Sequence, residues 1–287
     1  MKKFTLKIGE VIYQIRSEIP FCILGHYQDY LLNTNDYDYS VIIRKQRKLN
    51  NNYNSEDYFK YLGFGYLNSE NIEQKGIIRG KDLVPEWIST LSQNGEINVS
   101  VYEEQLYEKL YFKSIFHMLN IEKTLLKYES LTLHSSYIRL NNSAYLFTAP
   151  SGTGKSTQAE LWKKYRHAQI INGDKTLLSH RSGSWTACGF PLSGTSKDCL
   201  NVSSPLKCLI VLEKGIENRI TVLSKPEAFK RIYSQCVVHF WDSDSVSKAM
   251  KLVESLIQNI PVVLYSCTKE EDAVNVFEQY LVKEGLY

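Results

Sequence analysis

The pattern of hydrophobic and polar positions changes near residue 130. Before that point, short alternating or apolar runs predict strands at Phe4–Ile8, Val11–Ile15 and Tyr39–Ile43. Apolar residues at helical spacing predict one or two helices within Glu103–Leu126. These elements predict a mainly antiparallel α+β region over residues 1–125, and no residue in it stands out as a chemical site.

Beyond residue 130, predicted strands alternate with predicted helices. Apolar runs indicate strands at Tyr137–Leu140, Ala144–Thr148, Ala168–Ile171, Lys207–Glu213 and Val262–Ser266. Helical spacing indicates helices at Ser156–Tyr165, Pro226–Cys236, Ser245–Gln258 and Lys269–Glu284. Thr268 is the expected N-cap of the last helix, with Glu271 three residues on. The alternation predicts an α/β domain over residues 126–287.

Composition and charge narrow the classes of protein to consider. The 287 residues carry a formal net charge of +3, too small for this length to indicate nucleic-acid or membrane binding. No apolar run reaches the length of a membrane span, and no apolar segment follows Met1-Lys2-Lys3-Phe4 as in a secretory signal. Six cysteines without metal spacing favour reduced, mostly buried thiols. We therefore expect a cytoplasmic protein without a nucleic-acid partner.

The segment between the strand ending at Thr148 and the next helix matches a phosphate-binding loop. The residues expected to contact a nucleotide are Ser151, Gly152, Thr153, Gly154, Lys155, Ser156 and Thr157. Gly152 and Gly154 allow unusual dihedrals, and the helix start offers N–H groups to an anion. Lys155 can reach the β- and γ-phosphates of ATP, and the Ser156 hydroxyl can bind Mg²⁺. Ala149 replaces the first glycine of the general pattern, so the turn there must accommodate a Cβ.

A carboxylate and an imidazole accompany this loop in the sequence. Asp174 follows the strand Ala168–Ile171 through Asn172-Gly173, and we expect that strand beside the loop strand. A carboxylate there can bind Mg²⁺ or take a proton from a hydroxyl; the alternative is a turn aspartate without a chemical role. His134 stands just ahead of the predicted hairpin, where it lies near the γ-phosphate or the acceptor, or is structural.

Together these residues resemble the core of the HPr kinase/phosphorylase family. The resemblance rests on Leu133-His134-Ser135-Ser136, the hairpin, the loop and Ile170-Ile171-Asn172-Gly173-Asp174, and covers about residues 130–270. The loop wording also resembles ATP-type phosphoenolpyruvate carboxykinase, which shares the nucleotide site of that fold. The resemblance implies that Lys155 and Ser156 bind phosphates and Mg²⁺, and that His134 and Asp174 position or deprotonate an acceptor hydroxyl. Gly173 replaces the first acid of the family's acidic pair.

The chain further downstream, in Gly189–Lys197 and Asn201–Lys207, is similar to HPr-kinase-related proteins and free-serine kinases with the same core. Its loop Ser193–Lys197 offers a glycine turn, hydroxyls and one cation. Lys197 can supply charge to a transition state, or the segment is an ordinary surface loop. The segment that the bifunctional enzymes use for phosphorolysis has no counterpart here, which argues against HPr as the acceptor.

The sequence thus predicts a P-loop, HPr-kinase/carboxykinase-like core with an N-terminal α+β portion. The expected function is transfer of the γ-phosphoryl group of ATP, with Mg²⁺, to serine in a peptide, a protein or the free amino acid. A nucleotide-binding regulatory module with little or no kinase activity is the alternative from another class. A kinase that uses pyrophosphate or ADP as donor also stays open. Related kinases are often oligomers, which leaves a homo-oligomer as an alternative to a monomer.

Overall fold

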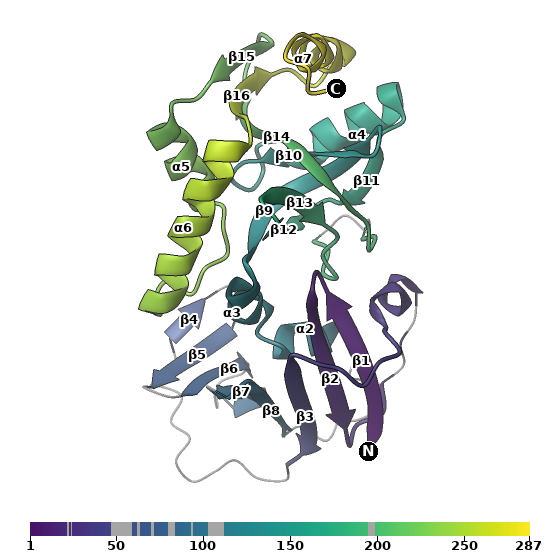
Figure 1. Ribbon diagram of the computed structural model, residues 1–287, viewed down its shortest axis with the longest axis vertical. Coiled ribbons are helices and arrows are strands. Elements are labelled where there is room, and N and C mark those ends of the chain that lie inside the picture. Colours follow the sequence, from purple (N-terminus) through teal and green to yellow (C-terminus); the bar gives the residue numbers. More distant parts are fainter. Residues whose placement is uncertain are drawn as a thin grey trace. The chain divides into compact units, whose positions relative to one another are not determined.

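The chain divides into two compact units, Met1–Thr124 and Leu125–Tyr287, both drawn in Figure 1. The computed structural model describes residues 1–21, 23, 25–46, 59–61, 64–69, 72–79, 84–92, 94–102, 112–194 and 199–287. The expected helical segment Glu103–Leu126 lies partly outside these residues. Its described part holds the short helices α2 (Phe112–Met118) and α3 (Ile121–Thr124).

The first unit is built around a sheet that has eight strands in the described residues. In spatial order these are β1 (Lys2–Ile8), β2 (Val11–Ser17), β3 (Tyr39–Lys45), β8 (Glu96–Val101), β7 (Val84–Ser92), β6 (Ile72–Arg79), β5 (Phe64–Ser69) and β4 (Phe59–Tyr61). The pairs β2–β3 and β3–β8 are parallel, and the other neighbouring pairs are antiparallel. The three strands predicted for this unit are confirmed.

One face of the sheet in the first unit is buried, and a side-chain contact joins the sheet to α3. Val41 and Ile43 of β3 are fully buried, as the two-residue period of a strand with one covered face requires. The Tyr13 and Tyr39 rings stack at 5.5 Å, and the Tyr13 hydroxyl lies 2.6 Å from Oγ1 of Thr124. That contact ties α3 to the sheet. A further helical element among the described residues, η1 (Gly25–Tyr30), buries Tyr30.

The second unit holds a mixed sheet arrangement in which two long strands take part in two sheets. Its strands are β9 (Ser130–Leu140), β10 (Ser143–Thr148), β11 (Gln169–Asn172), β12 (Lys175–Arg181), β13 (Ser184–Cys188), β14 (Ser203–Lys214), β15 (Arg219–Val222) and β16 (Val262–Cys267). The order is β10-β9-β12-β13-β14-β16-β15, with β11 on β9 and β10 also on β14. The pairs β10–β14 and β14–β16 are parallel.

Helices cover both faces of this arrangement (Figure 1). They are α4 (Lys155–Arg166), α5 (Lys225–Tyr233), α6 (Ser243–Asn259) and α7 (Glu271–Lys283), with the short η3 (Leu125–Tyr128) ahead of β9. In β10, Leu146 packs in the cluster of α5 and α6, whereas Phe147 packs in the cluster of α4 and α7. Because successive side chains point to opposite faces, a nearly continuous apolar strand fills two cores. The predicted α/β character of this unit is confirmed.

Two sequence-based boundaries need correction. The strand expected to begin at Tyr137 begins at Ser130, so His134 lies inside β9 and not ahead of it. Strand β12 was not predicted, and Ser130–His134 is the part of β9 that pairs with it. Thr268 is not the N-cap of α7, because the helix starts at Glu271 after Glu270. The backbone of Thr268 instead bonds to the side chains of Asn218 (2.9 Å) and Gln158 (2.8 Å), which hold it outside the helix.

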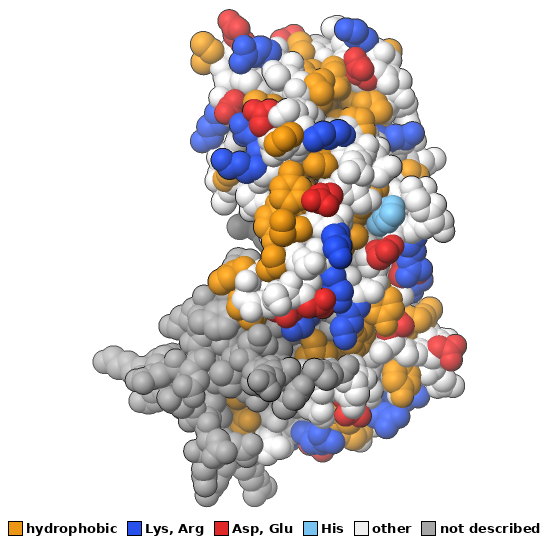
Figure 2. Space-filling model, turned by 60° about the vertical axis from the view of Figure 1, so that its left-hand side comes forward, with side chains coloured by type: hydrophobic (Ala, Val, Ile, Leu, Met, Phe, Trp, Pro, Cys, Tyr) orange, Lys and Arg blue, Asp and Glu red, His pale blue; other side chains and the backbone are white. Residues whose placement is uncertain are grey.

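The outer surface of the second unit mixes apolar and charged side chains. Figure 2 shows hydrophobic side chains between scattered charged ones on one face of the molecule. On and next to α6, Phe240 is 63% exposed and Met250 41% exposed. Of the helices that the structure describes, none has both the length and the apolar character for crossing a membrane.

Replacing Phe277 by Ala tests the core between α7 and the sheet. The Phe277 ring is fully buried and contacts the Trp162 ring of α4 edge-on, with 6.1 Å between the ring centroids. Its centroid lies 5.1 Å from that of the Tyr265 ring of β16. The cavity should lower the free energy of unfolding of this unit by about 3–5 kcal/mol, measured by urea denaturation. Val282→Ala on the same helix, at a position 59% exposed, is the matched control and should change it by under about 0.5 kcal/mol. Equal effects would contradict this description of the core.

Candidate active site

The loop between β10 and α4 has the backbone that its glycines predict. Gly152 has a φ of +77° and Gly154 a φ of +126°, values that side chains rarely adopt. A Cβ at either position would meet nothing within 4 Å, so backbone conformation and not space requires glycine there. Ala149, at the position of the missing first glycine, packs its methyl group in the α4–α7 core and is 1% exposed. A Cβ is therefore accommodated at the start of the loop.

Side chains of this loop differ in their exposure. Ser151, Ser156 and Thr157 are exposed, whereas Thr153 is half-buried. Lys155, the first residue of α4, is only 7% exposed, and its ammonium group donates to the carbonyls of Ala149 (2.8 Å) and Pro150 (3.4 Å). Burial lowers the pKa of Lys155, and the negative charge of Asp174 opposes this shift. The first-turn N–H groups of α4 lack intrahelical acceptors, so this end of the helix can hold an anion.

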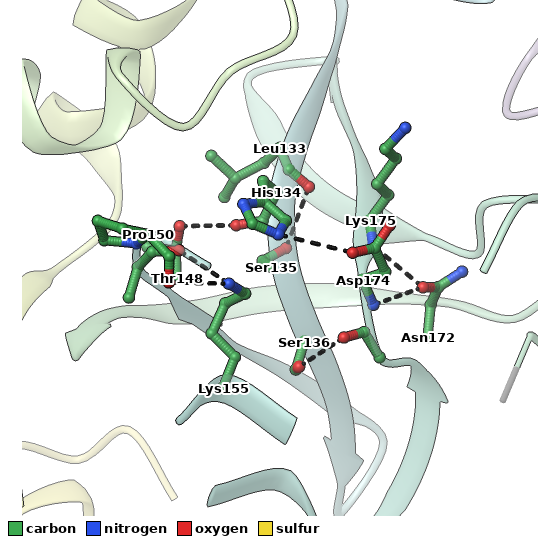
Figure 3. A network of polar contacts seen from close by, with 12 residues as sticks. Leu133, His134, Ser135, Ser136, Thr148, Pro150, Lys155, Asn172, Asp174 and Lys175 are labelled. Atoms are coloured by element: carbon green, nitrogen blue, oxygen red, sulfur yellow. Dashed lines mark hydrogen bonds and ion pairs between the residues drawn. The ribbon is translucent and has the colours of Figure 1, made fainter. Parts of the chain in front are cut away.

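Strand β9 brings His134 to the loop. His134 is paired with Lys175 of β12 on one side, and its neighbour Ser135 is paired with Thr148 of β10 on the other. The Oγ1 of Thr148, the last residue before the loop, donates to the carbonyl of His134 at 2.9 Å. Residues of three strands therefore meet at one point of β9, as Figure 3 shows.

Asp174 lies on the other side of His134. Its Oδ1 is 3.5 Å from Nε2 of His134, and the two side chains are 33% and 28% exposed. The contact with His134 is the largest effect that lowers the pKa of Asp174, and the charges of Lys175 and Lys155 add to it. Burial of the carboxyl group opposes the shift. The arrangement favours an ionised carboxylate at Asp174.

The sequence predicted that the strand leading to Asp174 lies next to the loop strand β10. This prediction is wrong. β11 pairs with β9, and β9 separates it from β10. The parallel neighbour of β10 is β14. The same stretch of β9 bonds β10 along one edge and β11 along the other. Asp174 therefore reaches the loop region across β9.

Lys197 lies outside the described residues, as does the whole of the segment 195–198. The described residues just before it approach Asp174. A Cβ on Gly194 would lie 2.8 Å from Cγ and 3.0 Å from Oδ1 of Asp174, so only glycine fits without a shift. The closeness of Gly194 to Asp174 was not predicted from the sequence. The glycine turn in Ser193–Lys197 is the feature of the sequence that could have indicated it. Asn172, the last residue of β11, was also not predicted as a site residue.

The donor set at this site suits Mg²⁺ better than a transition metal. The described residues contain no group of three or more His, Cys, Asp and Glu side chains that could hold a metal ion. They offer the carboxylate of Asp174 and the exposed hydroxyl of Ser156. Mg²⁺ is commonly held by one or two carboxylates together with substrate phosphates and water. The chemistry of these donors therefore fits a magnesium ion that arrives with a phosphate-bearing ligand.

A depression of about 520 Å³ adjoins the loop. It is lined by Thr153 and Gly154 of the loop, by Gln158 of α4, and by residues that follow β14 and β16, among them Gly215 and Thr268. Its volume is in the range of small-molecule sites. A ligand with phosphates on the loop can extend into it.

Replacing His134 by Ala should raise the pKa of Asp174 toward its ordinary value, because the imidazole contact is the largest lowering effect. Since the carboxyl pKa is depressed in the fold, its stabilising contribution is present above the ordinary carboxyl pKa and is lost as the pH falls through the folded value. A carboxyl ¹³C NMR titration measures the change. His180→Ala, a histidine in contact with Glu129 and Trp185, is the control and should leave the pKa of Asp174 unchanged. No change in His134→Ala would contradict the described contact.

Comparisons with known proteins add a distant structural likeness. No protein-family model matches the sequence, and no curated protein matches it. Among solved structures, the HPr(Ser) kinase/phosphatase from Coxiella burnetii is similar over 54% of this chain and 98% of that chain. The sequence identity is 12% and the TM-score 0.34, which indicates a distant structural relationship and carries no argument about ligand or activity.

Proposed function

We propose that this protein is a kinase that transfers the γ-phosphoryl group of ATP to a hydroxyl of serine, either free or in a peptide or protein. One observation carries the proposal. A glycine loop followed by a buried lysine begins where β10 ends, opposite Ser135 of β9 and next to the His134–Asp174 pair. An anion-binding helix start beside an ionised carboxylate suits phosphoryl transfer, in which positioning and charge neutralisation dominate.

Each described group has a role in the proposed reaction. The loop N–H groups and Lys155 bind the phosphates of ATP, and Ser156 and Asp174 hold Mg²⁺, which neutralises phosphate charge. Asp174 also accepts the proton of the acceptor hydroxyl, whose oxygen forms a bond to the γ-phosphorus as the bond to the β-phosphate oxygen breaks. His134 orients the Asp174 carboxylate. The depression next to Gly154 takes the nucleoside part of ATP.

The proposed site has one carboxylate where the HPr kinase/phosphorylase family has two. Gly173 stands where the HPr kinase/phosphorylase family has the first acid of its pair, and its carbonyl accepts from the Ser136 hydroxyl at 2.9 Å. Among the described residues next to His134, Asp174 is the carboxylate in contact with it. One carboxylate therefore serves both as metal ligand and as base. Lys197 is proposed as a further cation for the transition state.

Phosphate transfer from labelled ATP to serine, to candidate peptides and to HPr tests the function and identifies the acceptor. Asp174→Asn should lower the rate by roughly 10²–10⁴-fold, because the base is lost, while ATP still binds. Lys155→Ala should weaken ATP binding by roughly 10- to 100-fold, the value of a hydrogen bond to a charged group. Lys163→Ala, with a side chain 53% exposed on α4, is the control and should change neither.

The outcomes separate the proposal from its rival. A nucleotide-binding regulatory module would keep its function in Asp174→Asn and lose it in Lys155→Ala. Unchanged ATP affinity in Lys155→Ala would overturn the assignment of the loop itself. Inorganic tripolyphosphate is a useful comparison, because it lacks the nucleoside: ATP should bind more tightly if the depression next to Gly154 is used.

A further inference from the structure

Asn172, the last residue of β11, has a fully buried side chain whose amide makes hydrogen bonds to four backbone groups and a longer contact, 4.0 Å, with Sγ of Cys199. Its Oδ1 accepts from the N–H groups of Asp174 (2.9 Å) and Lys175 (3.0 Å). Its Nδ2 donates to the carbonyls of Phe190 (3.0 Å) and Leu192 (3.1 Å). Both partners of the oxygen are donors and both partners of the nitrogen are acceptors, so only one orientation of the amide satisfies all four.

On one side, these bonds hold the backbone of Asp174. Its N–H donates to Asn172, and its carbonyl accepts from the N–H of Ser135 on β9 at 3.0 Å. Figure 3 shows Asn172 and His134 on opposite sides of Asp174. With both backbone groups fixed, the carboxylate is directed toward His134 without help from another charged residue on β11.

On the other side, the same amide anchors the segment 190–194. Phe190 and Leu192 are buried, and Cys199 adds a bond from its Sγ to the carbonyl of Phe190 at 3.0 Å. Two residues beyond Leu192, Gly194 comes so close to Asp174 that a Cβ would lie 2.8 Å from its Cγ. The segment is therefore placed against the carboxylate, and the Asn172 side chain bonds both to the segment and to the backbone of Asp174.

We infer that Asn172 is a positioning residue: it holds Asp174 toward His134 and fixes Ser193–Gly194 beside the carboxylate, as one wall of the acceptor site. The inference rests on the proposed function, in which Asp174 takes the proton of the acceptor. An acceptor hydroxyl must come within hydrogen-bond reach of that carboxylate. A loose Asp174 backbone would therefore slow transfer without weakening the contacts of the loop with ATP.

Kinetics of Asn172→Ala test the inference. The turnover number should fall roughly 10- to 100-fold, because a misplacement of about 1 Å can cost that much, while ATP affinity stays within about twofold. Ser136→Ala is the control: it removes a buried bond to Gly173 in the same turn, and should reduce turnover less than threefold. Equal losses of turnover in the two variants would overturn the inference, because the loss of any buried hydrogen bond in the turn would then have the same effect as the loss of Asn172.

A double-mutant cycle distinguishes positioning from a general structural role. In the Asp174→Asn background, adding Asn172→Ala should cost little further activity, because a positioning residue acts through the group that it positions. Full additivity of the two losses would overturn the inference. If the wild-type chain transfers no phosphate to any acceptor, the proposed function itself fails, and the next measurement still tests the role of Asn172.

Amide hydrogen exchange needs no activity. In Asn172→Ala the N–H groups of Asp174 and Lys175 should exchange at least tenfold faster than in the wild type, since both lose their acceptor. Asn172→Ser should restore protection at Asp174 and part of the turnover, because a serine hydroxyl can accept from the N–H two residues on. Unchanged exchange in Asn172→Ala would overturn the inference.

Gly194→Ala is the second variant, should Asn172→Ala fold poorly. It leaves the four bonds of Asn172 in place and forces the carboxylate or the segment to shift. The expected result is again lower turnover with unchanged ATP affinity. Normal turnover in Gly194→Ala would contradict the placement of this segment at the acceptor side.

Discussion

Strand β9 is hydrogen-bonded on both edges, and the candidate site depends on this pairing. One edge bonds β10, which leads into the glycine loop, and the other bonds β11 and β12, which flank Asp174. Near the loop, the segment around Gln235 takes over the first edge, where its carbonyl accepts from the N–H of His134 at 2.9 Å. His134 therefore has little freedom along the sheet. Its side chain is placed between the loop end and Asp174 by main-chain bonds.

The two-sided core keeps this strand arrangement in place. β10 and β14 send alternate side chains to the α5–α6 face and the α4–α7 face, so neither strand can slip by one residue without moving its apolar side chains to the wrong core. Helix α4 is held further by Arg166, which pairs with Glu278 of α7 through two bonds of 2.7 Å. A rigid sheet and a fixed helix start are what a loop needs to hold its N–H groups ready for an anion.

Few groups contact the two charged side chains of the site, Lys155 and Asp174. The buried ammonium group of Lys155 relies on two carbonyls of the loop, and Asp174 relies on His134. Neither Lys155 nor Asp174 forms a short ion pair with an oppositely charged side chain, so both can bind a charged ligand. In the proposed kinase this leaves the lysine for phosphate and the carboxylate for metal and acceptor. The neutral Asn172 keeps the geometry without adding charge.

The glycine loop, Lys155 and the following helix were predictable from the sequence, because a strand, a tight turn and a helix start are set by residues that are close in the chain. So were three strands of the first unit and five of the second, whose apolar periodicity reflects burial directly. The His134–Asp174 contact, the bonds of Asn172 to Phe190 and Leu192, and the closeness of Gly194 to Asp174 were decided by the tertiary structure. These contacts join residues between 18 and 40 positions apart, across strands such as β12 whose weak pattern hid them. Local preference identifies a loop, but only strand register determines which distant side chains meet it.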